Sequence, residues 1–452
     1  MAVTSPSPTP PSGSDSRSED EPTSPAPRPW PGFYYGYWIL GGAFVAQMIS
    51  VGMMTSVVGP FVTPMTAELG WSTSDFFLAT TVSRFVMSGV GFAIGASVDR
   101  HGGRRFMFGG VAVLGAALFL AGSVDSLWQW VLLRGVMFTV GAALVGNLVV
   151  NVTMAKWWVT KRGRMIGFSS MGVSLAGMTF PLIATFLIDA LGWEAAWRVL
   201  ALIAVLAVLP VAFVMRRQPE DYGWHPDGLD DGQVRAGGGA AAQADYDNSF
   251  TRGEALRTRT LYLIILAFGL GGVGIQVMLV QSIPFLRDSG YSAGFAAVMA
   301  TTMSFPALLS KPFWGWAMDR MEAKSAAAIG FVQAGVAMMI IVFAATHDIV
   351  PLLIVGYALL GWGFGGQIPL QETIWGSYFG RRYLGSVRAV AMPISLVIGA
   401  SSPLLVALYR DTVGNYNGVF VGVGVCWLLA AVVVLFVRKP ARPLRRAPVT
   451  AA

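Results

Sequence analysis

The sequence contains few of the residues that enzymes and metal proteins use for chemistry. Among its 452 residues are one cysteine and three histidines, and His101, His225 and His347 fall in predicted loops far apart along the chain. A single cysteine excludes a disulfide framework and a thiolate metal cluster, and no spacing of histidines and carboxylates matches a metal site. A Gly-Lys-Ser/Thr phosphate-binding loop is also absent. The sequence therefore predicts no enzyme, no cofactor and no transport driven by ATP bound to this chain.

Charged residues are scarce as well. They make up only 12% of the chain, whereas 54% of the residues are hydrophobic, so a water-soluble surface would be hard to build. A helix needs roughly 20 apolar residues to cross a hydrocarbon core about 30 Å thick. Twelve stretches have that length, and the predicted fold class is an all-α membrane protein with twelve transmembrane helices. The stretches cover residues 36–59, 76–98, 106–124, 128–155, 164–188, 195–215, 260–283, 293–318, 326–345, 350–373, 386–408 and 418–437.

The basic residues predict the orientation of these helices. Of the 31 lysines and arginines, 25 fall in the tails and in the loops of one side, whereas only Arg198, Arg287 and Arg410 fall in loops of the other side. Because basic loops stay in the cytoplasm, this distribution predicts a multi-pass protein of the cell membrane with both termini cytoplasmic. The net charge of +7 follows from this insertion pattern. The lipid bilayer is therefore an expected partner, and a nucleic acid is not.

Polar segments divide the chain. Residues 1–32 are rich in Pro and Ser and lack the basic-then-apolar order of a signal peptide, so a disordered cytoplasmic tail is expected. Residues 216–259 contain runs of Gly and Ala and are predicted to be a flexible cytoplasmic linker. This linker separates an N-terminal six-helix half, residues 33–215, from a C-terminal six-helix half, residues 260–437. Residues 438–452 form a second, basic cytoplasmic tail.

The two predicted halves repeat one pattern of residues. Matching residues recur at an offset of 220, and of 222 after the register slips by two. Two like apolar halves are typical of membrane carriers that bind their solute between the halves. The sequence thus predicts two pseudo-symmetric bundles. The recurring pairs include Gly70 and Gly290, Ser72 and Ser292, Gly95 and Gly315, Asp99 and Asp319, Arg100 and Arg320, Gly141 and Gly363, and Gly163 and Gly385.

The loop after the second predicted helix carries a family resemblance. The stretch Gly95-Ala-Ser-Val-Asp99-Arg100-His-Gly-Gly-Arg104-Arg105 is similar to the loop motif of the major facilitator superfamily, and Gly315-Trp-Ala-Met-Asp319-Arg320 is its second copy. The segment from Lys156-Trp-Trp to Pro181 resembles the helix 4 to helix 5 region of the monocarboxylate and oxalate/formate carriers. The resemblance implies the major facilitator fold and alternating access to a central site.

The charged residues of these loops have two interpretations. On charge patterning alone, they form a cluster that keeps the loops in the cytoplasm. In the family that the sequence resembles, the Asp and Arg groups of this loop help to hold the cytoplasmic gate between the halves, and an Asp at a helix terminus can engage backbone dipoles. The duplication favours a gating role. The gating candidates are Asp99, Arg100, Arg104, Arg105, Asp319 and Arg320.

Three basic residues lie within predicted helices. Arg84 and Lys311 fall about 12 Å from the nearer helix end and Arg134 about 9 Å, at about 1.5 Å per residue, and Arg134 is shallow enough to snorkel. Buried cations in hydrocarbon usually face a polar cavity or a partner. Glu372 is the only acid expected at a similar depth. The excess of positive charge predicts an anionic substrate bound by Arg84, Lys311 and Arg134, and Glu372 is the candidate for proton coupling.

The resemblance adds detail to this site. Ser310-Lys311-Pro312 is similar to the place on helix 8 where the monocarboxylate carriers hold a substrate-binding Arg before Pro, and a Lys would bind a carboxylate there as a point charge. Arg388 is expected at the entry of helix 11, which argues against the two-cation arrangement of the oxalate carriers. Neutral polar residues on helices 4, 7 and 10, which line the cavity in the superfamily, complete the predicted substrate site: Asn147, Gln276 and Gln367.

Together these features predict a secondary active transporter that moves a small organic anion, with a monocarboxylate preferred, by proton symport or by exchange with a counter-anion. The expected partners are that anion, the bilayer, and a proton or counter-anion. One alternative is a facilitator-type exporter of drugs or other solutes, which is favoured if the buried cations are structural. A second is a non-transporting membrane sensor, against which the absence of a recognisable signalling domain counts.

Overall fold

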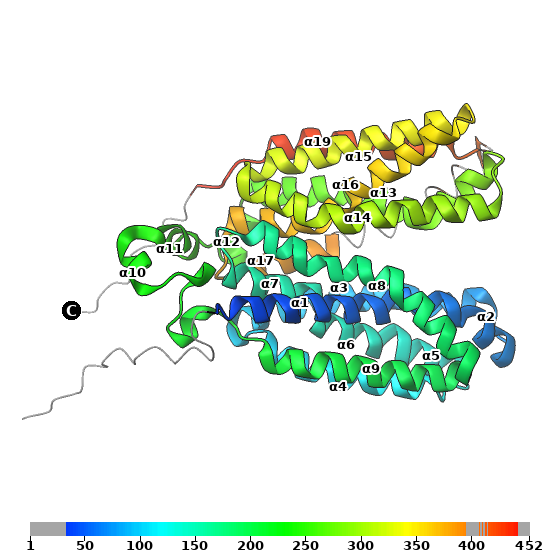
Figure 1. Ribbon diagram of the computed structural model, residues 1–452, viewed down its shortest axis with the longest axis horizontal. Helices are drawn as coiled ribbons and strands as arrows, with labels where there is room; N and C mark the ends of the chain where they lie inside the picture. Colours follow the sequence, from blue (N-terminus) through cyan, green and yellow to red (C-terminus); the bar gives the residue numbers. More distant parts are fainter. Residues whose placement is uncertain (1–32, 395–405, 407–408, 410–411, 414, 442–452) are drawn as a thin grey trace, which may run out of the picture.

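A computed structural model of the chain describes residues 33–394 and 415–441, together with residues 406, 409, 412 and 413. Within these residues every regular element is a helix, and the helices form two bundles that lie side by side (Figure 1). Ten helical segments of the described part are long and apolar enough to cross a membrane. The all-helical membrane fold predicted from the sequence is confirmed. The predicted tail at 1–32, part of the eleventh predicted span and most of the C-terminal tail lie outside the described residues.

The N-terminal bundle contains six spans, and its first and fourth spans are interrupted. A π-helical turn at residues 52–56 separates α1 from α2 within the first span, and the fourth is divided among α5, a π-helical segment at residues 131–137, α6 and α7. The helices of this half are α1 (Gly36–Val51), α2 (Val58–Leu69), α3 (Thr73–His101), α4 (Gly103–Ala121), α5 (Leu127–Trp130), α6 (Phe138–Val145), α7 (Asn147–Trp157), α8 (Arg162–Leu191) and α9 (Trp193–Val214).

The C-terminal bundle has longer uninterrupted helices where the first half has broken ones. Its seventh and tenth spans, α13 and α16, each run for 30 residues. The described helices of this half are α13 (Arg259–Asp288), α14 (Ala293–Arg320), α15 (Ala323–Thr346), α16 (Val350–Phe379), α17 (Leu384–Ala389) and α19 (Asn417–Leu435).

The turn before the second helix of each bundle shows why the repeated residues recur. Gly70 and Gly290 have φ values of 69° and 94°, which glycine adopts at little cost. The hydroxyls of Ser72 and Ser292 then accept a hydrogen bond from the backbone N–H three residues later, at 3.1 and 3.2 Å. A serine at this position satisfies one of the free amides of the first helical turn. The Gly-x-Ser repeat therefore ends one helix and starts the next in both halves.

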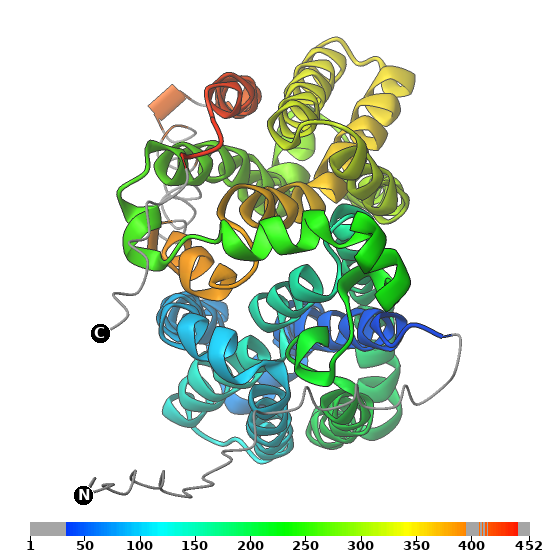
Figure 2. The same ribbon diagram turned by 90° about the vertical axis from the view of Figure 1, so that its left-hand side faces the viewer.

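Residues 216–259 fold, in contrast to the flexible linker that the sequence predicts. They form several short helices, which include α10 (Asp231–Gln233), α11 (Ala240–Asp247) and α12 (Arg252–Leu256). Figure 2 shows this segment lying across one end of both bundles. We call this end of the molecule the linker end and the opposite end the far end.

Ion pairs explain why this linker is ordered. The Asp245 carboxylate lies 3.0 Å from Arg162 of the N-terminal half and 3.8 Å from Arg381 of the C-terminal half, and Arg381 also lies 2.6 Å from Glu220. In addition, the amide of Phe250 donates a hydrogen bond of 2.8 Å to the carbonyl of Phe379. From composition alone, the acidic residues of this segment are expected to be solvated. In the folded protein, Asp245 and Glu220 instead pair with Arg162 and Arg381.

Glycines allow the two halves to approach closely near the linker end. A Cβ atom on Gly95 would lie 2.5 Å from the carbonyl oxygen of Gly385, and a Cβ atom on Gly315 would lie 2.6 Å from the carbonyl carbon of Gly163. Both contacts therefore need glycine. Each pairs a repeated glycine of one half with a repeated glycine of the other, so the duplication places the same close contact on both sides of the molecule.

We expect Asp245→Ala to loosen the linker while leaving both bundles folded, because Arg162 and Arg381 lose the carboxylate that they share. Trypsin should then cleave after the exposed Arg235 about 5-fold faster, which corresponds to about 1 kcal/mol of local opening free energy. Limited proteolysis of the purified protein, followed by mass spectrometry, measures this rate.

Asp247→Ala is the matched control for this experiment. Asp247 lies in the same helix, is exposed, and accepts a hydrogen bond from Gln243 within that helix. Its loss should leave the cleavage rate unchanged. Equal cleavage rates in the two variants would contradict a role for the Asp245 ion pairs in ordering the linker.

Candidate functional site

Two aspartates join the halves at the linker end by binding the first turn of a helix in the opposite half. Near the C-terminus of α3, the Asp99 carboxylate accepts hydrogen bonds from the backbone amides of Gly385 and Ser386, at 2.9 and 2.7 Å, and from the Ser386 hydroxyl at 2.7 Å. Near the end of α14, Asp319 binds the first-turn amides of α8 in the same way, at 2.7 and 3.1 Å. These amides have no partner within their helix, and the helix dipole favours a negative charge beside them.

The basic residues next to these aspartates differ from the predicted ones. Lys156 Nζ lies 3.8 Å from the Asp99 carboxylate, and Arg164 Nε lies 3.2 Å from that of Asp319. The four arginines of the predicted gating set, namely Arg100, Arg104, Arg105 and Arg320, have exposed side chains instead. Arg100 and Arg320 directly follow the aspartates and so point about 100° further around the helix, whereas Arg104 and Arg105 lie in the next helix, α4.

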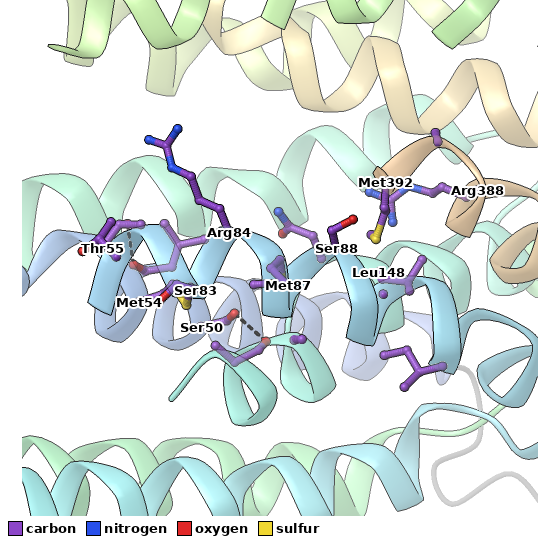
Figure 3. A pocket seen from close by; sticks show the side chains of 18 of the residues that line it. Ser50, Met54, Thr55, Ser83, Arg84, Met87, Ser88, Leu148, Arg388 and Met392 are labelled. Carbon is purple, nitrogen blue, oxygen red and sulfur yellow. Dashed lines mark hydrogen bonds between the residues drawn. The ribbon is translucent and has the colours of Figure 1, made fainter. Parts of the chain in front are cut away.

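A central cavity of about 610 Å³ lies between the halves. Figure 3 shows side chains of α3 and of the first span pointing toward it, with Arg388 and Met392 approaching from the C-terminal half. Of the predicted substrate-site residues, four line this cavity, namely Arg84, Arg134, Asn147 and Gln276.

The wall from the N-terminal half is built by irregular backbone. Both π-helical segments, at residues 52–56 and 131–137, contribute lining residues, and π-helical turns often occur at functional sites. At Gly146 the fourth span leaves the helical conformation, with φ −84° and ψ −154°, which separates α6 from α7. The Ser50 hydroxyl compensates for part of this break, since it donates a hydrogen bond of 2.9 Å to the carbonyl of Ala142. The continuous sequence pattern of the fourth span contained no sign of this interruption.

Arg134 is buried without a carboxylate partner in the described part of the chain. Only 2% of it is exposed, and its guanidinium donates to the Ser83 hydroxyl at 3.3 Å and to the backbone carbonyl of Met54. Its Nε atom has no hydrogen-bond acceptor. Neutral oxygens therefore hold the side chain in place, while its charge stays uncompensated.

Arg84 directly follows Ser83, the hydroxyl partner of Arg134, and extends from α3 into the cavity (Figure 3). Among the described residues it has neither an ion-pair nor a hydrogen-bond partner. The two arginines thus place an excess of positive charge on one wall of the cavity. In a site shielded from water, such a charge is costly unless an anion compensates it.

Glu372 forms an ion pair that the sequence did not predict. Its carboxylate accepts a hydrogen bond from Arg388 of α17, and the Asn151 amide lies beside it. Asn151 in turn accepts a hydrogen bond of 3.2 Å from Gln47, which also donates to Ser169 at 3.3 Å. A chain of buried polar groups therefore connects the first, fourth, fifth, tenth and eleventh spans beside the cavity.

Two predicted substrate-site residues do not line the cavity. Lys311 and Gln367 are only 3% and 8% exposed and lie outside its wall. The backbone of Lys311 packs against α8 instead, so closely that a Cβ atom on Gly167 would lie 2.5 Å from its carbonyl oxygen. The contact between α14 and α8 thus covers the part of α14 that carries Lys311. No ion pair or hydrogen bond joins the Lys311 ammonium to another described residue.

The sequence also missed residues that the structure places in the cavity wall. Arg388 was expected at the entry of helix 11, yet it reaches the cavity, because the preceding residues of α17 are drawn inward by Asp99. Trp375 was also missed; it lies on α16 one turn after the cavity-lining Gln371, on the face next to Glu372. The spacing of residues 371, 372 and 375 on one helix could have indicated this face, whereas the position of Arg388 depends on tertiary contacts.

Comparisons with known proteins agree with this architecture. The family model described as Major Facilitator Superfamily matches residues 43–298 and 276–451. The oxalate:formate antiporter of Oxalobacter formigenes is 26% identical over 358 residues, which cover 76% of this chain and 79% of that protein. A probable 4-methylmuconolactone transporter of Cupriavidus pinatubonensis is 26% identical over 347 residues, 75% of this chain and 74% of that one. The solved structure of the proton:xylose symporter XylE superimposes with a TM-score of 0.72 at 13% identity, covering 90% of this chain and 96% of that chain.

We expect Asp99→Asn to open the linker end, because an amide binds the first-turn amides of α17 less well than a carboxylate does. Replacing the native Cys426 with Ala and introducing Val98→Cys, at a position that is 1% exposed beside Asp99, provides a reporter. In detergent solution, a thiol reagent should modify it about 5- to 100-fold faster in the Asp99→Asn background, the range expected of a coupling free energy of 1–3 kcal/mol.

Asp75→Asn serves as the matched control for this measurement. Asp75 lies on the same helix at the far end, where it forms a capping box with Ser72, so its replacement leaves the boundary between the halves intact. An unchanged modification rate in Asp99→Asn would mean that this carboxylate does not hold the linker end closed.

Proposed function

Because the chain belongs to the major facilitator superfamily, we propose that it is a secondary active transporter of an organic anion, with a monocarboxylate preferred. One observation carries this proposal. The cavity between the halves contains Arg84 and Arg134 but no carboxylate to neutralise them among the described residues. The remaining cavity cation, Arg388, is already paired with Glu372. An anionic solute would supply the missing negative charge and so bind more tightly than a neutral solute of the same shape.

The relatives support this choice of solute. The names of the two similar transporters refer to oxalate and formate, which are carboxylates, and to an organic lactone. In this chain the arginines that face the cavity come from the second and fourth spans, whereas the resemblance to the monocarboxylate carriers pointed to Lys311 on the eighth. We therefore assign the first contact with the solute to the arginines and a later contact to Lys311, which becomes available when α14 and α8 separate.

Orientation follows from the charges at the linker end. The linker end carries most of the basic loop residues, which favours its placement, together with both termini, in the cytoplasm of a cell membrane. The halves are joined there through Asp99 and Asp319, so in this orientation the arrangement would be a state closed toward the cytoplasm. Alternating access would then require both aspartates to release the helices that they bind, while the cavity closes at the far end.

The source of energy has two candidates, proton symport and exchange of one anion for another. Glu372 is a buried carboxylate beside the cavity, and its partner Arg388 lines the cavity. A solute that reaches Arg388 would compete with Glu372 for contact with this side chain. Release from this pair would leave the Glu372 carboxylate free to bind a proton. This competition offers a way for anion binding and proton binding to depend on each other.

We expect Arg84→Ala to weaken anion binding by about 10- to 100-fold, the effect of removing a charge-assisted hydrogen bond worth 1.5–3 kcal/mol. Lys311→Ala should lower the transport rate, and Lys311→Arg should keep part of it. Initial rates of labelled carboxylate uptake into proteoliposomes, measured over a range of concentrations, separate the two effects.

Arg287→Ala is the control for the loss of one positive charge, since Arg287 is exposed at the far end of α13. It should leave uptake unchanged. Wild-type affinity in a well-inserted Arg84→Ala variant, or undiminished transport of neutral amphipathic solutes, would favour the alternative of a drug-type exporter.

Glu372→Gln tests the coupling. If Glu372 carries the transported proton, the glutamine variant should still exchange substrate for substrate, because exchange needs no net proton movement, but it should not accumulate substrate in response to a pH gradient. Counterflow and pH-driven uptake in the same proteoliposomes measure the two activities. Loss of both activities would mark Glu372 as the structural partner of Arg388, and survival of pH-driven accumulation would remove it from the mechanism.

A further inference from the structure

The central cavity has two chemically different ends. Toward the far end, the hydroxyls of Thr55, Thr80 and Ser83 surround Arg84 and Arg134. Toward the linker end, large apolar side chains line the cavity, namely Met87, Ile94, Leu148, Trp375 and Met392, and four polar residues, Ser88, Asn147, Gln371 and Arg388, lie among them. Figure 3 shows this order, with Arg84 and Thr55 near one end of the cavity and Leu148 and Met392 near the other.

The cavity is also long compared with a simple acid. Arg84 and Ile94 lie ten residues apart on α3, a rise of about 15 Å at 1.5 Å per residue. The cavity volume of about 610 Å³ falls in the range of roughly 300–1,000 Å³ that encloses solutes of drug-like size. A formate or acetate ion would fill a small part of this space and leave the apolar end in contact with water or empty.

The apolar end has no unpaired charge to offer a second carboxylate. Its only cation among the described residues, Arg388, is 11% exposed at the side chain and bound to Glu372. A dicarboxylate placed with one group at Arg84 would have to bury the other against Leu148 and Met392, or break that ion pair. Either alternative is costly, since an isolated carboxylate is strongly disfavoured in apolar surroundings.

We infer that the transported anion is a monocarboxylate with an elongated apolar body, such as a medium-chain alkanoate or an arylalkanoate. Its carboxylate binds at Arg84 and Arg134, and its body extends along Met87 toward Leu148, Trp375 and Met392. This inference rests on the proposed function and specifies its substrate class. The methionines suit such a solute, because their unbranched and polarisable side chains adapt to bodies of different shape. Trp375 provides a flat surface for an aromatic ring.

A series of straight-chain acids tests this inference. Acetate, butyrate, hexanoate and octanoate would compete for uptake of labelled octanoate into proteoliposomes that contain the full chain. The inhibition constant should fall by about two- to threefold per added methylene, less than the roughly fourfold expected for complete burial of each group. Phenylpropionate should compete about as well as hexanoate, and the dicarboxylate suberate about 10-fold less well than octanoate. Parallel measurements on protein-free liposomes subtract the passive entry of the longer acids.

Met87→Trp tests where the body lies. A larger side chain at this position, one turn from Arg84, should narrow the path to the apolar end and reduce octanoate uptake at least about 10-fold, while uptake of acetate or butyrate changes less than about twofold. Met178→Trp is the matched control, because Met178 lies on α8, is 39% exposed and does not line the cavity. The retained uptake of short acids shows that the variant is folded and inserted.

The outcomes distinguish this inference from the proposed function. If the inhibition constant did not fall with chain length, or if Met87→Trp reduced the uptake of long and short acids equally, the substrate would not be elongated. The proposal of a carboxylate carrier would still stand. Stronger inhibition by suberate than by octanoate would show that Arg388 binds a second carboxylate, which also overturns the inference of an elongated monocarboxylate. Failure to transport any carboxylate of the series would reject the proposed function itself.

Discussion

The arrangement of the two halves depends on carboxylates that bind helix starts across the boundary between them. Asp99 and Asp319 are each shielded from water and each satisfied by amides that their own half does not provide. Burial of an ionised carboxylate is costly unless such donors are present. The closed arrangement is therefore cooperative, because separation of the halves exposes both the aspartates and the amides of α8 and α17. The paired glycines make this possible, since any side chain at Gly95 or Gly385 would hold the helices too far apart.

This boundary is symmetric, whereas the cavity is not. At the repeat offsets of 220 and 222, Arg84 corresponds to Ser304, Arg134 to Gly356 and Lys311 to Gly91, so each cation is present in one copy alone. The interrupted first and fourth spans likewise face uninterrupted α13 and α16. A solute with one charged and one apolar end needs a cavity whose two halves differ in chemistry. Closing the linker end, in contrast, uses the same contact from both halves. The cavity cations are therefore present in one copy, whereas the residues of the boundary contacts are present in both.

The sequence predicts contacts that follow from local pattern and misses those that follow from tertiary packing. The helices and the Gly-x-Ser repeat could be read from hydropathy and repetition, whereas the expectation that Asp99 and Asp319 lie between the halves came from the family resemblance. Neighbouring arginines shared the motif but point away from the boundary, because helical geometry turns adjacent side chains apart. Arg388 and Lys311 could not be placed, since the first depends on how Asp99 holds α17 and the second on how α14 packs against α8. The prediction of a flexible linker was wrong for a similar reason, because the charged side chains of residues 216–259 find their ion-pair partners only in the folded protein.

The short helix α17 contacts both the boundary between the halves and the wall of the cavity. Ser386 binds Asp99 at the boundary, and Arg388, two residues later, binds Glu372 beside the cavity. Six residues of helix are too few to bend between these positions, so a change in the partner of Arg388 acts on the first turn that Asp99 holds. A ligand shifts the equilibrium between a closed and an open linker end only by the difference between its affinities for these two states. A solute whose contact with Arg388 weakens the pair with Glu372 would gain that difference while it loosens α17. Binding in the cavity and opening of the linker end would then be linked through a single helical turn, without a longer chain of contacts.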